Sequence, residues 1–300
     1  MPSILRGEGR VVLFLALCIL LAEGGMRLIE KRLSKDIEHI RSIPLMAETM
    51  RAHDGKKILV IGNSLTRCAI DPGIIRDQMI KDGARNPGLF FFYPDATSAA
   101  NWDYGVRRYF LNAGCKPDEI FIGTGPRHLA DRTGGDAARL GAFYVPRDQV
   151  MRALREDCPD YEQKAEFIIA RFSILYASRS KVKPRLFGPL IPDYFDMEQW
   201  VNHQRDPGGR SATTATDTFG HIDALLGLLR EEKIPVHVFT IPQPEHYELA
   251  PEARRIIGDH AAKLHDLANI PSISAARFSD GYHLDAEGAV LFSSALATHR

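Results

Sequence analysis

Two short motifs, far apart in the sequence, carry side chains that could do covalent chemistry. Gly62-Asn63-Ser64-Leu65 follows an apolar run and presents a serine hydroxyl at a tight turn. Asp280 and His283 stand on one loop, just before the last expected helix. A serine hydroxyl becomes a useful nucleophile when a base lies beside it, and the base needs a group that orients it. Together the two motifs supply these three parts and so predict acyl transfer through a serine.

The first motif also has a plainer interpretation. Gly62-Asn63-Ser64 could be an ordinary strand-to-helix turn in which a polar residue caps the helix, and such turns are common. The aspartate and histidine of the later loop favour catalysis over this interpretation, because they supply the partners that a lone serine lacks.

The elements that must position these residues follow from alternating apolar runs and helical patterns. Short apolar runs bounded by glycine or proline predict buried parallel strands. The expected strands are Lys57–Ile61, Gly88–Tyr93, Glu119–Ile122, Pro235–Ile241 and Ile270–Ile273. A helix is expected from Pro72 to Ile80, with Asp71 as its N-cap residue. Further helices are expected at Ser98–Asn112, Asp217–Lys233, Pro251–Leu267 and Asp285–Thr298. This order predicts an α/β fold, a three-layer α/β/α sandwich around a central parallel sheet of about five strands. In such sheets the functional residues lie at the carboxyl ends of the strands. Ser64 and the Asp280/His283 loop should therefore meet at that edge of the sheet.

Three further segments surround or interrupt this pattern. Residues 1–33 form an expected membrane anchor or signal segment, and residues 34–55 a charged helical connector to the main domain, 56–300. The alternation stops at about 127–214, which we interpret as a helical insertion because so long a loop is unusual in a compact domain. Its expected helices lie near Arg147–Arg155 and Tyr161–Lys181.

The amino-terminal segment has two interpretations. Arg6 and Arg10 precede a continuous apolar run from Val11 to Ala22, which has the length of a signal-peptide core. If the helix continues to Ile29, it becomes long enough to cross a bilayer. We favour an uncleaved single-pass anchor in the cell membrane, with the rest of the chain periplasmic or extracellular. A soluble cytoplasmic protein, in which this helix packs against the domain, is the competing interpretation.

Composition narrows the range of partners. The 300 residues contain 38 basic and 38 acidic side chains, so no basic face is implied and nucleic acid is not an expected partner. The four cysteines form no C-x-x-C pair, which argues against a zinc site. We expect buried free thiols, with one disulfide as the alternative in an exported domain. No cofactor and no metal are expected.

With these motifs in place, the sequence resembles the SGNH/GDSL hydrolase superfamily. Gly62-Asn63-Ser64-Leu65 is similar to that family's first block, with asparagine in place of its aspartate, and Asp280-x-x-His283 is similar to its last block. The resemblance covers about residues 56 to 300 and implies a flavodoxin-like sandwich. It implies that Ser64 is the nucleophile, His283 the general base and Asp280 the residue that orients it.

The two middle blocks of the family are altered. Where the family has a glycine oxyanion donor after the second strand, this chain has Asp95 or Ala96. Where the family has an asparagine after the third strand, Arg127 or His128 stands. We place Ala96, Arg127 and Asn63 in the oxyanion or substrate-binding set, since a backbone N–H or a guanidinium can bind an anion. Arg127 could equally be an ordinary surface arginine.

The anchor, the insertion and the missing asparagine are similar to the layout of exported SGNH-like proteins that acylate cell-surface polymers. That resemblance implies a serine-dependent acyl esterase or O-acyltransferase, with an acyl donor and a carbohydrate or polymer acceptor. A multi-spanning membrane acyltransferase is an implied partner. The alternative is a catalytically inactive SGNH-like protein that binds polysaccharide or scaffolds a membrane complex, and the altered oxyanion blocks motivate it.

Overall fold

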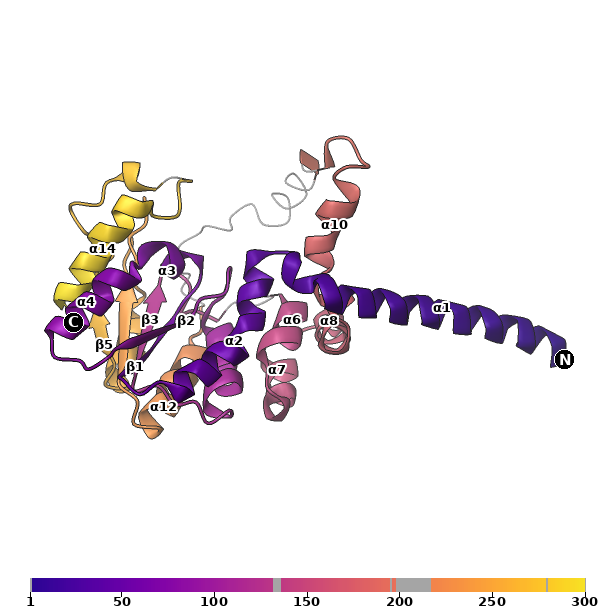
Figure 1. Ribbon diagram of the computed structural model, residues 1–300, viewed down its shortest axis with the longest axis horizontal. Coiled ribbons are helices and arrows are strands. Elements are labelled where there is room, and N and C mark those ends of the chain that lie inside the picture. The colour runs from indigo at the N-terminus through magenta and orange to yellow at the C-terminus, as the bar shows by residue number, and fades with distance from the viewer. Residues whose placement is uncertain (1, 132–135, 195, 198–216, 279, 300) are drawn as a thin grey trace. The chain divides into compact units, whose positions relative to one another are not determined.

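Five parallel strands form one sheet in the order β2-β1-β3-β4-β5, which is the flavodoxin-like order. Figure 1 shows this sheet with helices on either side of it. The strands are β1 Lys57–Ile61, β2 Gly88–Phe92, β3 Glu119–Thr124, β4 Val236–Thr240 and β5 Lys263–His265. The predicted α/β/α sandwich with about five parallel strands is confirmed. The strand order reverses direction at β1, and binding sites in such sheets lie at the carboxyl ends of the strands next to this reversal.

Helices cover both faces of this sheet. Side chains alternate between the faces along a strand, and one set, including Ile58, Val60, Phe121 and Phe239, forms a buried cluster with residues of three helices. These helices are α3 Ser64–Ala69, α4 Pro72–Lys81 and α14 Ala286–His299. The helices of the other face are α5 Ala99–Val106, extended by the π-helical turn η2 Arg107–Leu111, then α12 Gly220–Glu231 and α13 Pro251–Asp259.

The fifth strand is not where the sequence pattern put it. We expected a helix through Leu267 and a strand at Ile270–Ile273, but α13 ends at Asp259 and β5 begins at Lys263. The helix ends because Ala261 adopts a left-handed conformation, with φ 55°, and the chain then pairs with β4. The segment expected as a strand contains Pro271, which has no N–H for a strand ladder.

The structure describes residues 2–131, 136–194, 196–197, 217–278 and 280–299, and the chain divides into two compact units. Unit 2 consists of Ser42–Thr133, Tyr144–Gln149 and Arg210–Arg300 and contains the sheet. Unit 1 consists of Met1–Arg41, Gly134–Phe143 and Val150–Gly209. Residues 198–214 of the predicted insertion lie outside the described residues.

Unit 1 is helical where it is described. Its helices are α1 Pro2–Ile29, η1 Glu30–Arg32, α6 Ala137–Arg139 with the π-helical turn η3 Leu140–Tyr144, α7 Val150–Glu156, α8 Tyr161–Phe172, α9 Ile174–Ala177 and α10 Arg179–Phe187. The helix α2, Lys35–Ala52, starts in unit 1 and ends in unit 2. The single helix expected at Tyr161–Lys181 is wrong, because Ser173 is extended and its hydroxyl caps α9 through the Tyr176 amide at 3.1 Å.

Helix α1 is apolar and largely unpacked. Within Glu8–Arg32, an 18-residue window has a mean hydropathy of 2.1, and 6% of that window is buried. By length and composition this stretch is able to cross a membrane, and its place near the amino terminus also suits a signal sequence. Large apolar side chains from Val11 to Leu21 are more than half exposed.

Candidate active site

Ser64 opens α3 directly after the central strand β1. Asn63 is the N-cap residue, and its side-chain oxygen accepts a hydrogen bond from the Leu65 amide at 3.0 Å. Helix α3 comes close to the strands because Gly62 and Gly123 carry no Cβ, which would stand 1.9 and 2.4 Å from the Thr66 hydroxyl oxygen. The sequence therefore fixes the serine at the first turn of a helix, at the carboxyl end of the sheet.

Strand β3 is longer than expected because Gly123 lies within the strand and does not end it. We predicted that Gly123 would stop the third strand, but the strand continues to Thr124, since both residues pair with β4. Gly123 serves close packing against Thr66 and Phe239.

Asp280 and His283 share one tight turn before α14. One carboxylate oxygen of Asp280 accepts hydrogen bonds from the Tyr282 and His283 amides, at 3.0 and 2.7 Å. The turn needs Gly281 because the backbone there has φ 73°, a left-handed conformation that favours glycine. The other carboxylate oxygen lies 2.7 Å from His283 Nδ1. The aspartate thus fixes both the backbone and the imidazole of the histidine.

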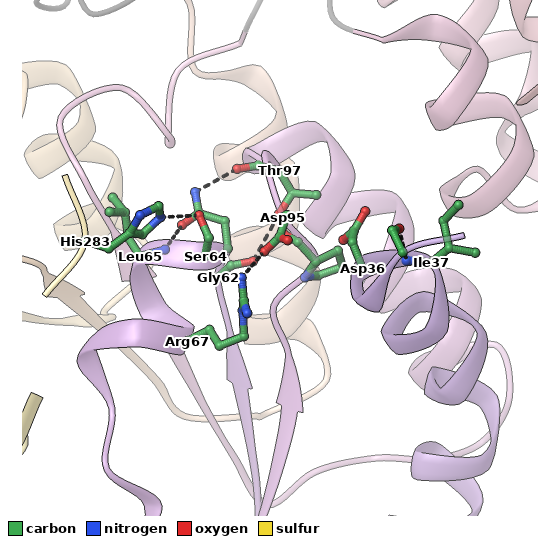
Figure 2. A network of polar contacts seen from close by, with 12 residues as sticks. Asp36, Ile37, Gly62, Ser64, Leu65, Arg67, Asp95, Thr97 and His283 are labelled. Atoms are coloured by element: carbon green, nitrogen blue, oxygen red, sulfur yellow. Dashed lines mark hydrogen bonds and ion pairs between the residues drawn. The ribbon is translucent and has the colours of Figure 1, made fainter. Parts of the chain in front are cut away.

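The two motifs meet in space. His283 Nε2 lies 2.9 Å from Ser64 Oγ (Figure 2). This contact completes a chain of hydrogen bonds from Asp280 through the imidazole to the hydroxyl. The side chains of His283 and Asp280 are 25% and 55% exposed. In this arrangement the histidine can take the serine proton, while the carboxylate holds the ring and faces the positive charge that develops on it.

The charge state of Asp280 follows from these contacts. The hydrogen bond with His283, together with those from the His283 and Tyr282 amides, holds the pKa of Asp280 below its ordinary value. The carboxylate therefore stays ionised across the neutral and weakly acidic range and remains able to accept a hydrogen bond from the Nδ1–H of His283.

Ala96 lies in the turn that follows β2, and the backbone there is unusual. Ala96 has φ 53°, which is the left-handed region in which glycine is at ease. The chain thus keeps, with an alanine, the backbone conformation that a glycine would normally supply. Ala96 is exposed.

The same turn is tied to the nucleophile turn through buried polar groups. Asn63 Nδ2 donates to the Thr97 carbonyl at 3.1 Å. The Thr97 hydroxyl lies 3.1 Å from the Gly62 carbonyl, and Trp102 Nε1 donates to both at 3.0 Å. Both ends of the buried Asn63 amide are therefore engaged within the protein, and its side chain positions the two turns (Figure 2).

Arg127 and His128 follow β3. Arg127 forms an ion pair with Asp217 at 3.5 Å, and His128 Nδ1 accepts a hydrogen bond from the Gly125 amide at 3.0 Å. His128 thus caps its own turn, while the guanidinium of Arg127 is about one-third exposed.

One pair beside the site was not expected from the sequence. Arg67, one helical turn after Ser64, pairs with Asp95 at 2.6 Å, and the two side chains are 42% and 39% exposed (Figure 2). The pair links α3 to the turn that carries Ala96. In the sequence, Arg67 stands three residues after Ser64, and this spacing is too common in helices to mark Arg67 as a site residue.

Within the described parts of the chain, no group of three or more histidine, cysteine, aspartate or glutamate side chains could hold a metal ion. The four cysteines are free; Cys115 and Cys158 are buried, Cys68 is half-buried and Cys18 is exposed.

No protein-family model matches the chain, and no curated protein gives a significant match. Among solved structures, the chain is similar to a lipase/acylhydrolase from Enterococcus faecalis, with 12% identity, a TM-score of 0.43, and 81% of this chain and 94% of that one covered. An acetylxylan esterase from Geobacillus stearothermophilus shows 11% identity and a TM-score of 0.40, with 83% and 95% covered. An α/β hydrolase enzyme from the metagenome of Lake Arreo, Spain, shows 13% identity and a TM-score of 0.38, with 81% and 95% covered. At similarity this low, the roles of residues rest on the geometry of this chain.

Proposed function

We propose that the chain is a serine-dependent acyl enzyme in which Ser64 is the nucleophile, His283 the general base and Asp280 the orienting residue. The observation that carries this proposal is the continuous chain of hydrogen bonds from Asp280 to Ser64 Oγ. These residues come from two loops separated by most of the domain, and both lie at the edge of the sheet where function collects.

The proposed reaction has two halves. Ser64 Oγ bonds to the acyl carbon of an ester or thioester, and its proton passes to His283 Nε2. The tetrahedral intermediate collapses, and the departing alcohol or thiol takes that proton and leaves an acyl-serine. Water or a sugar hydroxyl then attacks the acyl-serine with His283 as base again, which frees Ser64 and releases an acid or a new ester.

The negative oxygen of the intermediate needs hydrogen-bond donors. The first N–H groups of a helix have no partner inside the helix, so the amide of Ser64 is one proposed donor. The Ala96 amide is a second, because its turn is bound to the nucleophile turn through Thr97 and Asn63. Arg127, which forms an ion pair with Asp217, remains a proposed anion-binding residue.

We further propose that the substrate is an ester of a cell-surface carbohydrate or polymer. This rests on α1 as a single-pass anchor in the cell membrane, with the domain periplasmic or extracellular. If the acceptor is water the chain is an esterase, and if it is a sugar the chain is an O-acyltransferase. A transferase would take its acyl group from a donor, and a multi-spanning membrane acyltransferase is the proposed supplier.

The decisive experiment measures acyl transfer from p-nitrophenyl acetate by the full chain in detergent, beside Ser64→Ala. We expect turnover in the natural chain and a loss of about a thousandfold or more in Ser64→Ala. Labelling by a fluorophosphonate should occur at Ser64 and disappear in the same variant. A natural chain with neither turnover nor labelling would contradict the proposal and favour the inactive polysaccharide-binding or scaffold protein.

A further inference from the structure

Helix α8 carries large apolar side chains on two sides. Phe167 and Ala170 are fully buried, as expected for a stripe that faces the core. On the outer side, Ile168, Ile169 and Phe172 are 45%, 46% and 74% exposed. A helix at a protein–water boundary normally presents polar residues outward, so this outer side needs an explanation.

The exposed residues form one continuous stripe. Tyr161 is 90% exposed, and Ala165 is exposed as well. With Ile168, Ile169 and Phe172 they recur at the three- and four-residue spacing that places side chains on one helical face. Isolated exposed apolar residues are ordinary, but a contiguous apolar patch marks an interaction surface.

The carboxyl end of α8 is fixed against the end of α1. The Glu23 carboxylate accepts hydrogen bonds from the Ile174 amide at 2.8 Å and the Ser173 hydroxyl at 2.9 Å. Arg27 pairs with Glu23 at 2.9 Å and donates to the Phe172 carbonyl at 3.2 Å. These contacts place the backbone of Phe172 beside the last turns of α1.

The direction of α8 also suits a membrane surface. In Figure 1, α1 lies in the plane of the page while α8 is seen nearly end-on, so that α8 runs across the direction of α1. If α1 crosses a bilayer, α8 lies parallel to the bilayer surface, beside the last turns of the crossing helix. Amphipathic helices bind membranes in this orientation, and aromatic residues are enriched at that depth.

Cationic side chains are present on the neighbouring helix α10. Arg185 donates to the Arg32 and Leu33 carbonyls, at 3.2 and 2.6 Å, which holds α10 beside the end of α1. Lys181 and Lys183 on the same helix are exposed. Positive charges next to an apolar stripe suit a surface of anionic lipid headgroups.

We propose that the apolar stripe of α8, made by Tyr161, Ala165, Ile168, Ile169 and Phe172, lies in the headgroup region of the membrane that α1 crosses. This inference rests on the membrane anchor of the proposed function. Lipid is the occupant because the carboxyl end of the stripe is bonded to the last turns of the apolar helix α1, within one unit of the structure. The stripe would hold unit 1 flat on the membrane.

The test uses fluorescent probes on single cysteines of the full chain in vesicles of phosphatidylcholine and phosphatidylglycerol. The two accessible cysteines are replaced, as Cys18→Ala and Cys68→Ala. Cys115 and Cys158 are buried, and burial raises the pKa of the Cys158 thiol to about 11, which keeps it unreactive. Ile168→Cys then reports the stripe. Arg155→Cys, an exposed position on α7 of the same unit, is the matched control.

We expect the Ile168→Cys probe to lose about half of its fluorescence when the lipids are brominated near the headgroup, because the stripe lies at that depth. Aqueous iodide should quench it weakly. The Arg155→Cys probe should show the opposite pattern. Omission of phosphatidylglycerol should reduce the lipid quenching at Ile168→Cys, since Lys181 and Lys183 then lose their anionic partners.

A probe on the native Cys18 distinguishes two negative results, one in which α1 is not inserted in the membrane and one in which α1 is inserted but the stripe does not contact lipid. A probe on Cys18, with Cys68→Ala alone, should be quenched by lipid brominated near the ends of the acyl chains if α1 is inserted, because Cys18 lies near the middle of the apolar stretch. If Cys18 is quenched while Ile168→Cys is quenched by iodide like the control, the anchor stands and the inference is overturned. A probe at Ile168→Cys shielded from both quenchers would show that protein, such as a second copy, covers the stripe, which also overturns it. If Cys18 is not quenched, the anchor fails and the inference fails with it.

Discussion

At the scale of single residues, Ala96 shows how the chain departs from the resemblance without losing the backbone geometry. The left-handed φ of 53° at Ala96 destabilises the folded chain by about 1–2 kcal/mol. Glycine would remove this strain, but its greater freedom in the unfolded chain would lower stability by about 0.5–1 kcal/mol. We therefore expect Ala96→Gly to raise the free energy of unfolding by up to about 1 kcal/mol, measured by urea denaturation.

Ala100→Gly is the matched control for this substitution, because Ala100 lies inside α5. Glycine within a helix lowers stability by about 1 kcal/mol relative to alanine, so the two substitutions should have opposite signs. Equal losses in both variants would contradict the strain assigned to Ala96.

Asp280 has a testable charge state. Its pKa is lowered by the hydrogen bonds from His283 and the two turn amides. A lowered pKa means that the ionised group stabilises the folded chain above the unfolded value of about 3.9, and that this contribution is lost as the pH falls through the folded pKa. A carbon NMR titration of the Asp280 carboxyl should therefore stay flat from neutral pH down to about 4. A titration step above that value would contradict the geometry.

The same residue should matter for catalysis. Asp280→Asn keeps the size of the side chain but no longer holds the imidazole in the tautomer that accepts the serine proton. We expect kcat to fall about a hundredfold or more with the fold retained. Asp285→Asn, at the cap of α14, changes a carboxylate in the same loop and should leave kcat close to that of the natural chain. Similar losses in both variants would indicate a structural effect.

At the scale of elements, Thr97 links the turn after β2 to the nucleophile turn. It is buried, and its hydroxyl interacts with the Gly62 carbonyl and with Trp102 Nε1. Its hydroxyl also donates to the buried Pro94 carbonyl at 2.8 Å. Thr97→Val keeps the shape but removes this donor, so we expect a loss of about 1–3 kcal/mol in unfolding free energy and slower fluorophosphonate labelling of Ser64. Thr97→Ser keeps the hydroxyl and should change labelling little. Equal slowing in both variants would contradict a specific role for the hydroxyl, because Thr97→Ser retains it.

Much of this architecture could be predicted from the sequence. Strand β1 matches its expected bounds, because a β-branched run ended by Gly62 is a strong local signal, and Asp71 and Pro72 begin α4 as expected. The errors lie where tertiary pairing overrides local pattern. Strand β5 is short and has only its pairing with β4 to define it.

The candidate site also has a part that local sequence patterns predicted and a part that depends on tertiary contacts. Local motifs indicated Ser64, Asp280 and His283, since residue types and order carry that information. Sequence reasoning missed Thr97, which owes its importance to contacts with residues distant in the chain. It also could not foresee that Asn63 would use its amide inside the protein.

At the scale of the whole molecule, the proposed chemistry and the proposed membrane contacts belong to different units of the chain. Ser64, Asp280 and His283 are in unit 2, whereas Glu23 and the start of α9 are in unit 1. Separate cores imply that a local loss in one unit need not reach the other.

Glu23→Ala tests this separation. The substitution removes the carboxylate that accepts from Ser173 and Ile174, and leaving these donors unpaired should destabilise α9 and α10 by about 1–3 kcal/mol. In the full chain in detergent, amide hydrogen exchange should quicken in these helices while the rate of fluorophosphonate labelling at Ser64 stays unchanged. Glu162→Ala, which removes an exposed carboxylate of α8, should alter neither measurement. If labelling slows together with the faster exchange, the active site depends on the membrane-proximal unit, and catalysis would then be sensitive to how the chain sits on the membrane.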